Sequence, residues 1–146
     1  MELKIKTVRP SARVPAYATP GSAAMDLCAA CGESVAVAPG QRVMIPTGIA
    51  IELPGPDYVA LVFARSSLGV RHGLTLSNGV GVIDSDYRGE IQVGLINLSG
   101  EEYVVQPGER IAQLAVMPVA HAQITVTDTL SHTGRGEGGF GSTGKF

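Results

Sequence analysis

The chain has 146 residues, a net charge of −2, and a composition that is 45% hydrophobic and 16% charged. A chain of this length forms one domain that buries roughly 68–70% of its unfolded surface, and the composition is typical of a globular protein. The charge provides no basic surface for a nucleic-acid polymer, whose binding depends on many Lys and Arg contacts with phosphate. No apolar run approaches the ~18 residues of a membrane span, and the opening MELKIKTVRP does not resemble a signal peptide. We therefore expect a cytoplasmic protein without nucleic-acid or membrane partners.

Short apolar alternations, separated by turns rich in Pro and Gly, predict an all-β fold. The predicted strands include residues 3–5, 35–37, 43–45, 49–53, 58–63, 79–83, 91–97, 103–105, 110–119 and 123–127. Many short strands at this spacing favour a β-sandwich or barrel. One helical turn is expected at residues 66–71. From about Ser131 the composition changes to Gly, Ser, Thr and charged residues, which predicts an arm that is mobile without a ligand. We assign residues 1–133 to the barrel and residues 134–146 to an arm of the same domain.

Cys28 and Cys31 form a lone Cys-x-x-Cys pair. A structural zinc site requires four ligands, and His72, His121 and His132 show no matching spacing. A redox pair requires a thioredoxin-like βαβ context, which the pattern lacks. We predict two small, partly buried thiols.

Two strand-like stretches contain polar side chains that require partners. AAMDLCA places Asp26 in an apolar strand, where an unpaired carboxylate is costly, so a hydrogen-bond donor or a cation must lie beside it. ERIAQL (109–114) contains Arg110, which we expect to pair with a carboxylate. Gln113 in the same stretch presents an amide either to a ligand or to the backbone.

Two further stretches each have two interpretations. ARSSLG (64–69) places Arg65, Ser66 and Ser67 at the end of an apolar strand, as phosphate donors or with one serine as a helix cap. SNGVGVIDSDYRGEI (77–91) contains Asp84 and Asp86. The segment is either a hairpin whose turn is Asp-Ser-Asp, or Asp84 is a general base or a carboxylate near a metal.

The terminal stretch GRGEGGFGSTGKF (134–146) is one residue short of a phosphate-binding P-loop. Phe146 stands where a P-loop has the hydroxyl residue that holds Mg²⁺, so the P-loop interpretation fails. The remaining groups still suit phosphates and a base: Arg135, Phe140, Ser142, Thr143 and Lys145.

The stretches AAMDLCA, ARSSLG, SNGVGVIDSDYRGEI, ERIAQL and RGEGGFGSTG resemble, in order, the five motifs of the trimeric dUTPase family, the deoxyuridine 5′-triphosphate nucleotidohydrolases. The resemblance spans residues 23–144. It implies a distorted jelly-roll β-barrel subunit with one short helix, and a homotrimer whose active sites are shared between chains. It also implies the Mg²⁺-dependent hydrolysis of dUTP to dUMP and pyrophosphate, which limits uracil incorporation into DNA and supplies dUMP for dTMP synthesis. The Gly-rich arm is then a clamp that closes over a site elsewhere in the trimer.

The same resemblance implies a role for individual residues. Asp84 activates the water that attacks the α-phosphorus, and Asp26 holds Mg²⁺ through water. Tyr87 packs against the deoxyribose so that a 2′-hydroxyl does not fit. The implied phosphate contacts are Arg65, Ser66, Ser67 and Gln113, with Arg135, Gly141, Ser142 and Thr143 from the arm. The implied base contacts are Asn78, the backbone of residues 79–84 including Val82, Ile83 and Asp84, and Phe140 over the uracil ring, with Gln92 near the substrate.

The sequence departs from the family pattern at Ala64, where Pro is usual, and at Ala24, where Gly is common; neither removes a functional group. One rival is the related dCTP deaminase branch, which carries a catalytic Glu seven residues beyond the aromatic residue. This chain has Gly94 there, which has no side chain to transfer protons, so the residues present do not support deamination. The other rival is a trimeric binding protein without catalysis, which we would expect to have lost Asp84, Tyr87 or the arm.

Overall fold

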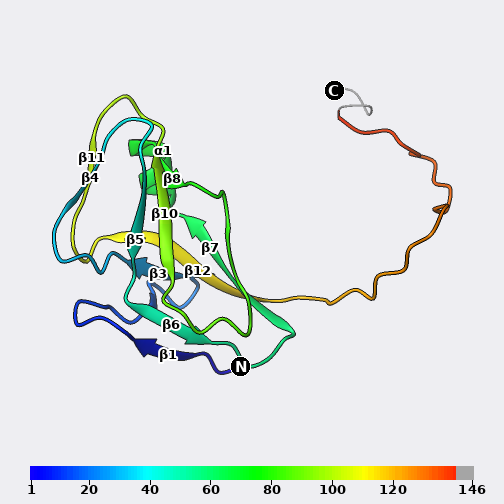
Figure 1. Cartoon of the computed structure of the whole chain (residues 1–146), viewed down its shortest axis with the longest axis horizontal. Helices are drawn as coiled ribbons and strands as arrows, with labels where there is room; N and C mark the ends of the chain where they lie inside the picture. Colours follow the sequence, from blue (N-terminus) through cyan, green and yellow to red (C-terminus); the bar gives the residue numbers. More distant parts are fainter. Residues whose placement is uncertain (141–146) are drawn as a thin grey trace.

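The computed structural model describes residues 1–140, and this range contains twelve β-strands and one helix (Figure 1). The strands pair in an antiparallel manner in four small sheets that enclose one apolar core. The all-β architecture predicted from the alternating pattern is therefore confirmed. No helix in the described range is long and apolar enough to cross a bilayer.

The largest sheet has five strands, and β12 lies at its centre. Along β12, Gln113 pairs with Asp26 of β3 on one side and with Phe63 of β7 on the other. The ends of these three strands therefore meet at one edge of the sheet. In order, the strands are β2 (Ala16–Tyr17), β3 (Met25–Cys28), β12 (Arg110–Pro118), β7 (Tyr58–Ala64) and β9 (Gly81–Ile83).

Three smaller sheets complete the barrel: β1 (Lys4–Thr7) with β6 (Ile49–Glu52); β5 (Arg42–Pro46), β10 (Gln92–Asn97) and β8 (Leu74–Leu76); and β4 (Val35–Val37) with β11 (Tyr103–Val105). Along strands such as β3, β7 and β10 alternate side chains point inward, as the pleat requires, whereas three successive residues of β6 are buried. Their fully buried members include Leu27, Ile45, Ile49, Leu95 and Leu114. Burial of each such side chain contributes roughly 1.5–3 kcal/mol.

The predicted helical turn is confirmed as α1 (Ser66–His72). Its N-cap residue is Arg65, in an extended conformation, and no side-chain hydrogen bond from the described chain caps the helix. The alternative that Ser66 or Ser67 acts as a cap is therefore wrong, and both hydroxyls remain exposed. Gly73 ends the helix in the left-handed conformation, as is common at helix C-termini.

The interpretation of residues 77–91 as a hairpin is wrong. Asp84 and Tyr87 do close a turn, in which the Tyr87 N–H donates to the Asp84 carbonyl at 3.2 Å. The strands on either side belong to different sheets, however, because β9 pairs with β7 whereas β10 pairs with β5 and β8.

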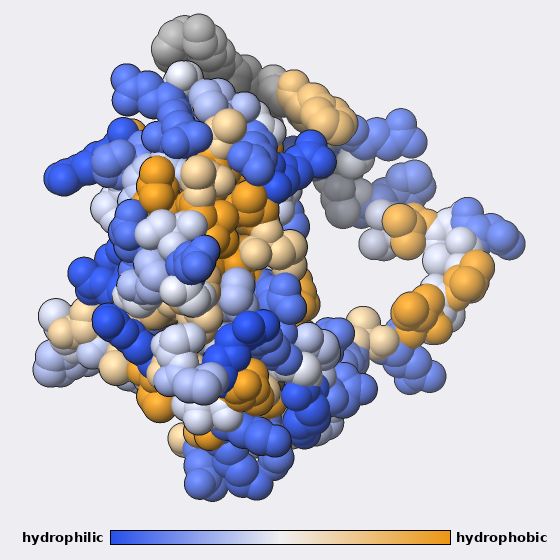
Figure 2. All heavy atoms as spheres, turned by 60° about the vertical axis from the view of Figure 1, so that its left-hand side comes forward, coloured by the Kyte–Doolittle hydropathy of each residue, from blue (hydrophilic) through white to orange (hydrophobic). Residues whose placement is uncertain are grey.

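The strand predicted at residues 123–127 is not formed in the single chain. The segment after Pro118 leads away from the barrel (Figure 1), and its apolar side chains stand clear of the body (Figure 2). Ile124 and Val126 are 89% and 93% exposed. A strand needs a neighbour for its N–H and C=O groups, and this chain supplies none within residues 1–140. The domain boundary at residue 133 stays a prediction.

Gly48 occupies a turn between β5 and β6 that only glycine fits. Its φ is +69°, and a Cβ built on it would lie 2.5 Å from the Cβ of Ala12. Its carbonyl accepts a hydrogen bond from the Val8 N–H at 2.8 Å, so the turn also holds the segment that follows β1.

We predict that Gly48→Ala lowers the free energy of unfolding by about 1–3 kcal/mol, because left-handed strain and the collision with Ala12 both oppose the new methyl group. Gly55→Ala is the matched control, since a Cβ there meets nothing within 4 Å, and it should change stability by no more than about 0.5 kcal/mol. Denaturant titration measures both variants. Equal midpoints for the two would contradict the prediction.

Candidate active site

Asp26 lies between two guanidinium groups at the edge where β3, β7 and β12 meet. Its Oδ2 accepts a hydrogen bond from Nη1 of Arg110 at 3.0 Å, and its Oδ1 lies 3.2 Å from Nε of Arg65. Arg65 Nη1 also donates to the Arg110 carbonyl at 3.1 Å. The Asp26 side chain is only 12% exposed. The predicted cationic partner of Asp26 and carboxylate partner of Arg110 are both confirmed.

The same edge presents further donors toward solvent. Gln113 lies directly opposite Asp26, and the exposed Ser66 and Ser67 follow Arg65. One carboxylate thus shares the edge with two guanidinium groups, two hydroxyls and an amide. This excess of donors suits phosphate oxygens, to which the planar guanidinium fork is well matched.

The metal-binding capacity of this edge is limited to one carboxylate. Nowhere in residues 1–140 do three or more His, Cys, Asp or Glu side chains gather closely enough to hold a metal ion. Asp26 Oδ1 is buried and makes no hydrogen bond in the described chain. Such a donor set fits Mg²⁺ that takes most of its oxygen ligands from phosphates and waters, and it does not fit an all-protein cage.

The two cysteines are free thiols, as predicted, with Cys31 buried and Cys28 partly buried beside the Asp26 edge. Burial raises the pKa of the Cys28 thiol above its ordinary value, against the opposing influence of Arg13, Arg110 and Arg65. A protonated thiol is a poor nucleophile and metal ligand.

The predicted nucleoside contacts gather in two adjoining cavities on the other side of β9. A narrow cavity of about 130 Å³ is lined by Asn78, Val82, Ile83 and Gln92, among others. A wider one of about 380 Å³ contains Asp84 and Tyr87 and shares Val82, Ile83 and Gln92 with the first. The structure therefore brings six predicted residues into one place: Asn78, Val82, Ile83, Asp84, Tyr87 and Gln92.

Tyr87 is 44% exposed, yet its ring is fixed. Its hydroxyl donates to the Glu90 carbonyl at 3.0 Å. A Cβ at residue 89 would collide with that hydroxyl, so Gly89 leaves the space that the ring occupies.

Gly94 lines the narrow cavity, at the position where a deaminase would carry its glutamate. A Cβ there would lie 2.7 Å from Oγ of Ser77 and 3.3 Å from Sδ of Met44. A side chain would fit only if Ser77 moved, so the pocket itself is built around a glycine.

Asp84 and the Arg65 edge lie toward opposite ends of β7, while the narrow cavity reaches Val62 near the middle of the strand. Ile83, which precedes Asp84, pairs with Ala60, whereas Arg65 lies five residues beyond Ala60. Extending this antiparallel register by one residue places Asp84 six residues from Arg65, or on the order of 20 Å along the strand at about 3.3 Å per residue. A general base acts within hydrogen-bond reach or through one water, so this separation places Asp84 away from the phosphate donors of its own chain.

The arm residues form a third group, which lies away from the Arg65 edge and from the cavities beside β9. The Arg135 side chain donates from Nε to the Gly138 carbonyl at 2.7 Å, and Phe140 is fully exposed. Gly141, Ser142, Thr143 and Lys145 lie outside the described residues, so their predicted roles stay predictions.

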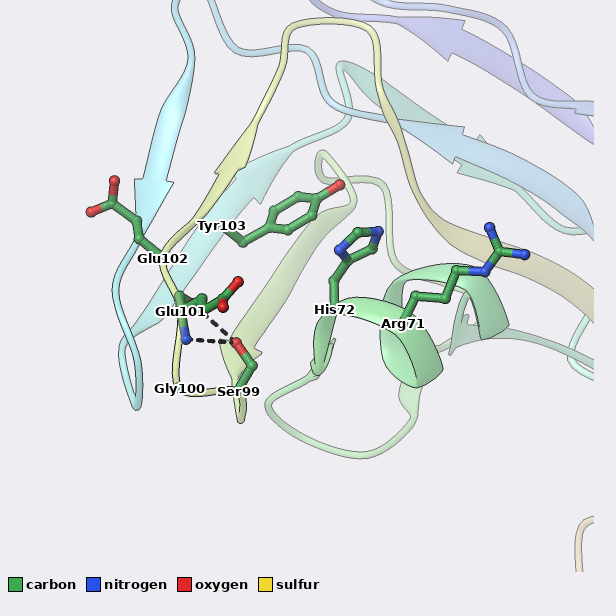
Figure 3. A pocket seen from close by; sticks show the side chains of 7 residues that line it. All are labelled: Arg71, His72, Ser99, Gly100, Glu101, Glu102 and Tyr103. Carbon is green, nitrogen blue, oxygen red and sulfur yellow. Dashed lines mark hydrogen bonds between the residues drawn. The ribbon is translucent and has the colours of Figure 1, made fainter.

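Sequence reasoning did not anticipate a cavity of about 560 Å³ between the end of α1 and the loop before β11 (Figure 3). His72 faces Tyr103 across it, with ring centroids 5.1 Å apart. Burial, with a hydrogen bond to Glu109, raises the pKa of Tyr103 to about 12. None of the site residues predicted above lines this cavity; its lining is Arg71, His72, Ser99, Gly100, Glu101, Glu102 and Tyr103.

Comparison with known proteins agrees with this geometry. The sequence profile of the dUTPase family matches residues 11–144. The chain belongs to the dUTPase family. Among curated relatives, the deoxyuridine 5′-triphosphate nucleotidohydrolase of Desulfitobacterium hafniense (strain DSM 10664 / DCB-2) is 53% identical over 146 residues, covering 99% of this chain and 97% of the relative. The enzyme of that name from Burkholderia cenocepacia is 48% identical, covering 99% and 98%.

A solved structure shares the fold over nearly the whole chain. A mutant of the Staphylococcus bacteriophage 80alpha dUTPase, determined with dUpNHpp, superposes with a TM-score of 0.89 at 25% identity and covers 98% of each chain. The predicted jelly-roll barrel of the dUTPase family is confirmed.

Proposed function

We propose that this dUTPase-family chain hydrolyses dUTP to dUMP and pyrophosphate in a homotrimer whose active sites combine groups from different chains. The observation that carries the proposal is that Asp84 and the phosphate donors around Arg65 lie toward opposite ends of β7, so that one chain does not bring them together. In the proposal, the Asp84 side takes the nucleoside and the Arg65 side takes the phosphates. The activity would limit uracil incorporation into DNA and supply dUMP, and we propose the cytoplasm as its location.

The nucleoside cavities support a uracil base attached to deoxyribose. β9 is the outer strand of the five-stranded sheet in the described chain, so one side of its backbone offers N–H and C=O groups to a ligand. Those groups and the Asn78 amide suit the alternating donors and acceptors of a uracil edge. The Tyr87 ring forms the wall against the sugar, where an added 2′-hydroxyl would meet it.

Asp84 supplies the general base in this proposal. Its exposed carboxylate lies in the cavity beside the nucleoside, where it can accept a proton from a water that attacks the α-phosphorus as pyrophosphate leaves. Arg65, Ser66, Ser67 and Gln113 of another chain would bind the phosphate oxygens and stabilise their developing charge. Mg²⁺, bound to the phosphates and through water to Asp26, would add a compensating positive charge.

The exposed arm supports the proposal that each chain contributes its C-terminal arm to a site on another chain. Ile124, Val126 and Leu130 are 86–93% exposed, and a neighbouring subunit would bury them. Beyond them, Arg135 and Phe140, with Gly141, Ser142 and Thr143, would close over the phosphates and base. A triphosphate is needed to order such a Gly-rich segment, because the segment cannot bury enough apolar surface alone.

The substrate class is tested by measuring pyrophosphate release from dUTP, dCTP, dTTP and UTP with Mg²⁺. We expect a strong preference for dUTP. Conversion of dCTP to dUTP would instead establish a deaminase, and binding without turnover of any of the four would establish a non-catalytic protein.

Asp84→Asn should lower kcat by a factor on the order of 10²–10⁴ while dUTP binding is largely retained, because the amide keeps the size and hydrogen bonding of the carboxylate but does not accept the proton. Asp86→Asn, in the same turn, is the matched control and should keep near-normal kcat. Steady-state pyrophosphate release and calorimetric binding measure the two quantities. A near-normal kcat in the Asp84 variant would remove this residue from the mechanism.

Mixed trimers test whether the site is shared. Arg65→Ala and a truncation that removes residues 134–146 should each be inactive alone, yet their mixture should recover activity after joint refolding. Recovery is expected because some sites would then take every group from intact copies. Mixed trimers that form without recovery would show that each chain builds its own site.

A further inference from the structure

Glu90, which carries the carbonyl that holds the Tyr87 hydroxyl, is bound by Arg9 from the N-terminal segment. Arg9 donates from Nε to Glu90 Oε1 at 2.6 Å and from Nη2 to Oε2 at 2.9 Å. The two residues are 81 positions apart in sequence. The Glu90 side chain is 15% exposed and that of Arg9 is 44% exposed. The paired guanidinium holds the pKa of the Glu90 carboxyl below its usual range, so the carboxylate stays charged at neutral pH.

The turn around Gly48 also binds this short segment, and its N–H reaches the same carboxylate oxygen as Arg9 Nε. The Gly48 N–H donates to Glu90 Oε1 at 2.8 Å, and the Thr47 hydroxyl donates to the Ile91 carbonyl at 2.6 Å. The Ile91 N–H in turn donates to the Ile49 carbonyl at 2.8 Å. Residues 90–91 are thus held at both side chain and backbone.

The position of Tyr87 depends on this attachment. Its ring is half exposed and therefore gains little restraint from core packing. Its hydroxyl bonds to the Glu90 carbonyl, so any displacement of Glu90 moves the wall of the cavity that Tyr87, Asp84 and Glu90 line together.

We propose that Arg9 and Glu90 are positioning residues that set the Tyr87 ring and thereby the discrimination between deoxyribose and ribose. This inference rests on the proposed function of the cavity. Arg9 is not among the residues that line either nucleoside cavity in the described chain, so it acts through Glu90. Exclusion of the ribose 2′-hydroxyl depends on the position of the Tyr87 ring. Small displacements of a group that contacts the substrate have large effects on kcat/KM.

The test compares kcat/KM for dUTP and UTP in Arg9→Ala, Arg9→Lys and Lys4→Met. Arg9→Ala should reduce the preference for dUTP over UTP by about tenfold or more, through a higher KM for dUTP and a lower KM for UTP, with kcat for dUTP nearly unchanged. Arg9→Lys should recover part of the preference, because it keeps the charge but not the two-pronged contact. Lys4→Met is the control: it removes the Lys4–Glu52 pair of 2.6 Å between β1 and β6, leaves Glu52 its contact with Arg88 at 3.9 Å, and should leave the preference intact.

Amide hydrogen exchange of residues 84–91 without ligand provides a second readout that needs no activity. Exchange should be faster in Arg9→Ala than in the wild type and unchanged in Lys4→Met. Unchanged exchange, or an unchanged dUTP-to-UTP preference in a folded Arg9→Ala protein, would overturn the inference. A wild-type protein that hydrolyses no dUTP would contradict the proposed function, while the exchange measurement would still decide whether Arg9 positions this loop.

Discussion

The placement of β12 between β3 and β7 is the constraint on which the candidate site depends. Its register puts Gln113 opposite Asp26 and brings the Arg110 and Arg65 guanidinium groups to one carboxylate. Burying a carboxylate to 12% exposure costs free energy unless a cation or hydrogen-bond donor lies beside it. A buried guanidinium group likewise costs free energy unless its N–H groups reach an acceptor. Asp26 therefore requires the guanidinium groups, whereas Arg110, whose side chain is 53% exposed, would be solvated without it, and the net excess of positive charge leaves the edge suited to phosphate.

A second consequence of the sheet is that one chain holds the site in separate pieces. Asp84 and the Arg65 edge lie toward opposite ends of β7, and the arm leads away from the barrel (Figure 1). In the proposed trimer the catalytic geometry would form only on assembly, which would link the activity to the oligomeric state. The proposed closure of the arm would add a step that a bound triphosphate stabilises, because the Gly-rich segment cannot bury enough apolar surface by itself.

Glycine determines where the nucleoside cavity can form. Gly89 leaves room for the Tyr87 ring, Gly94 leaves room for Ser77, and Gly48 turns the backbone so that its N–H reaches Glu90. At each position a Cβ would fill space that a neighbouring group already occupies. The shape of the cavity thus depends on the glycines, which leave space, as well as on the side chains that line it.

The sequence by itself determined the all-β class, the helix after β7, the free thiols and the charged partners of Asp26 and Arg110. These follow from local alternation, from turn chemistry and from the cost of an unpaired charge, all of which operate over a few residues. The resemblance in motif order added the site residues. Only the tertiary structure decided that the Asp84 turn joins two different sheets, that residues 123–127 lack a partner strand, that Arg9 reaches Glu90, and that Asp84 stands far from Arg65. A strand's alternation specifies which side chains face inward, but its pairing partner is chosen by closure of the whole barrel, over separations that no local pattern encodes.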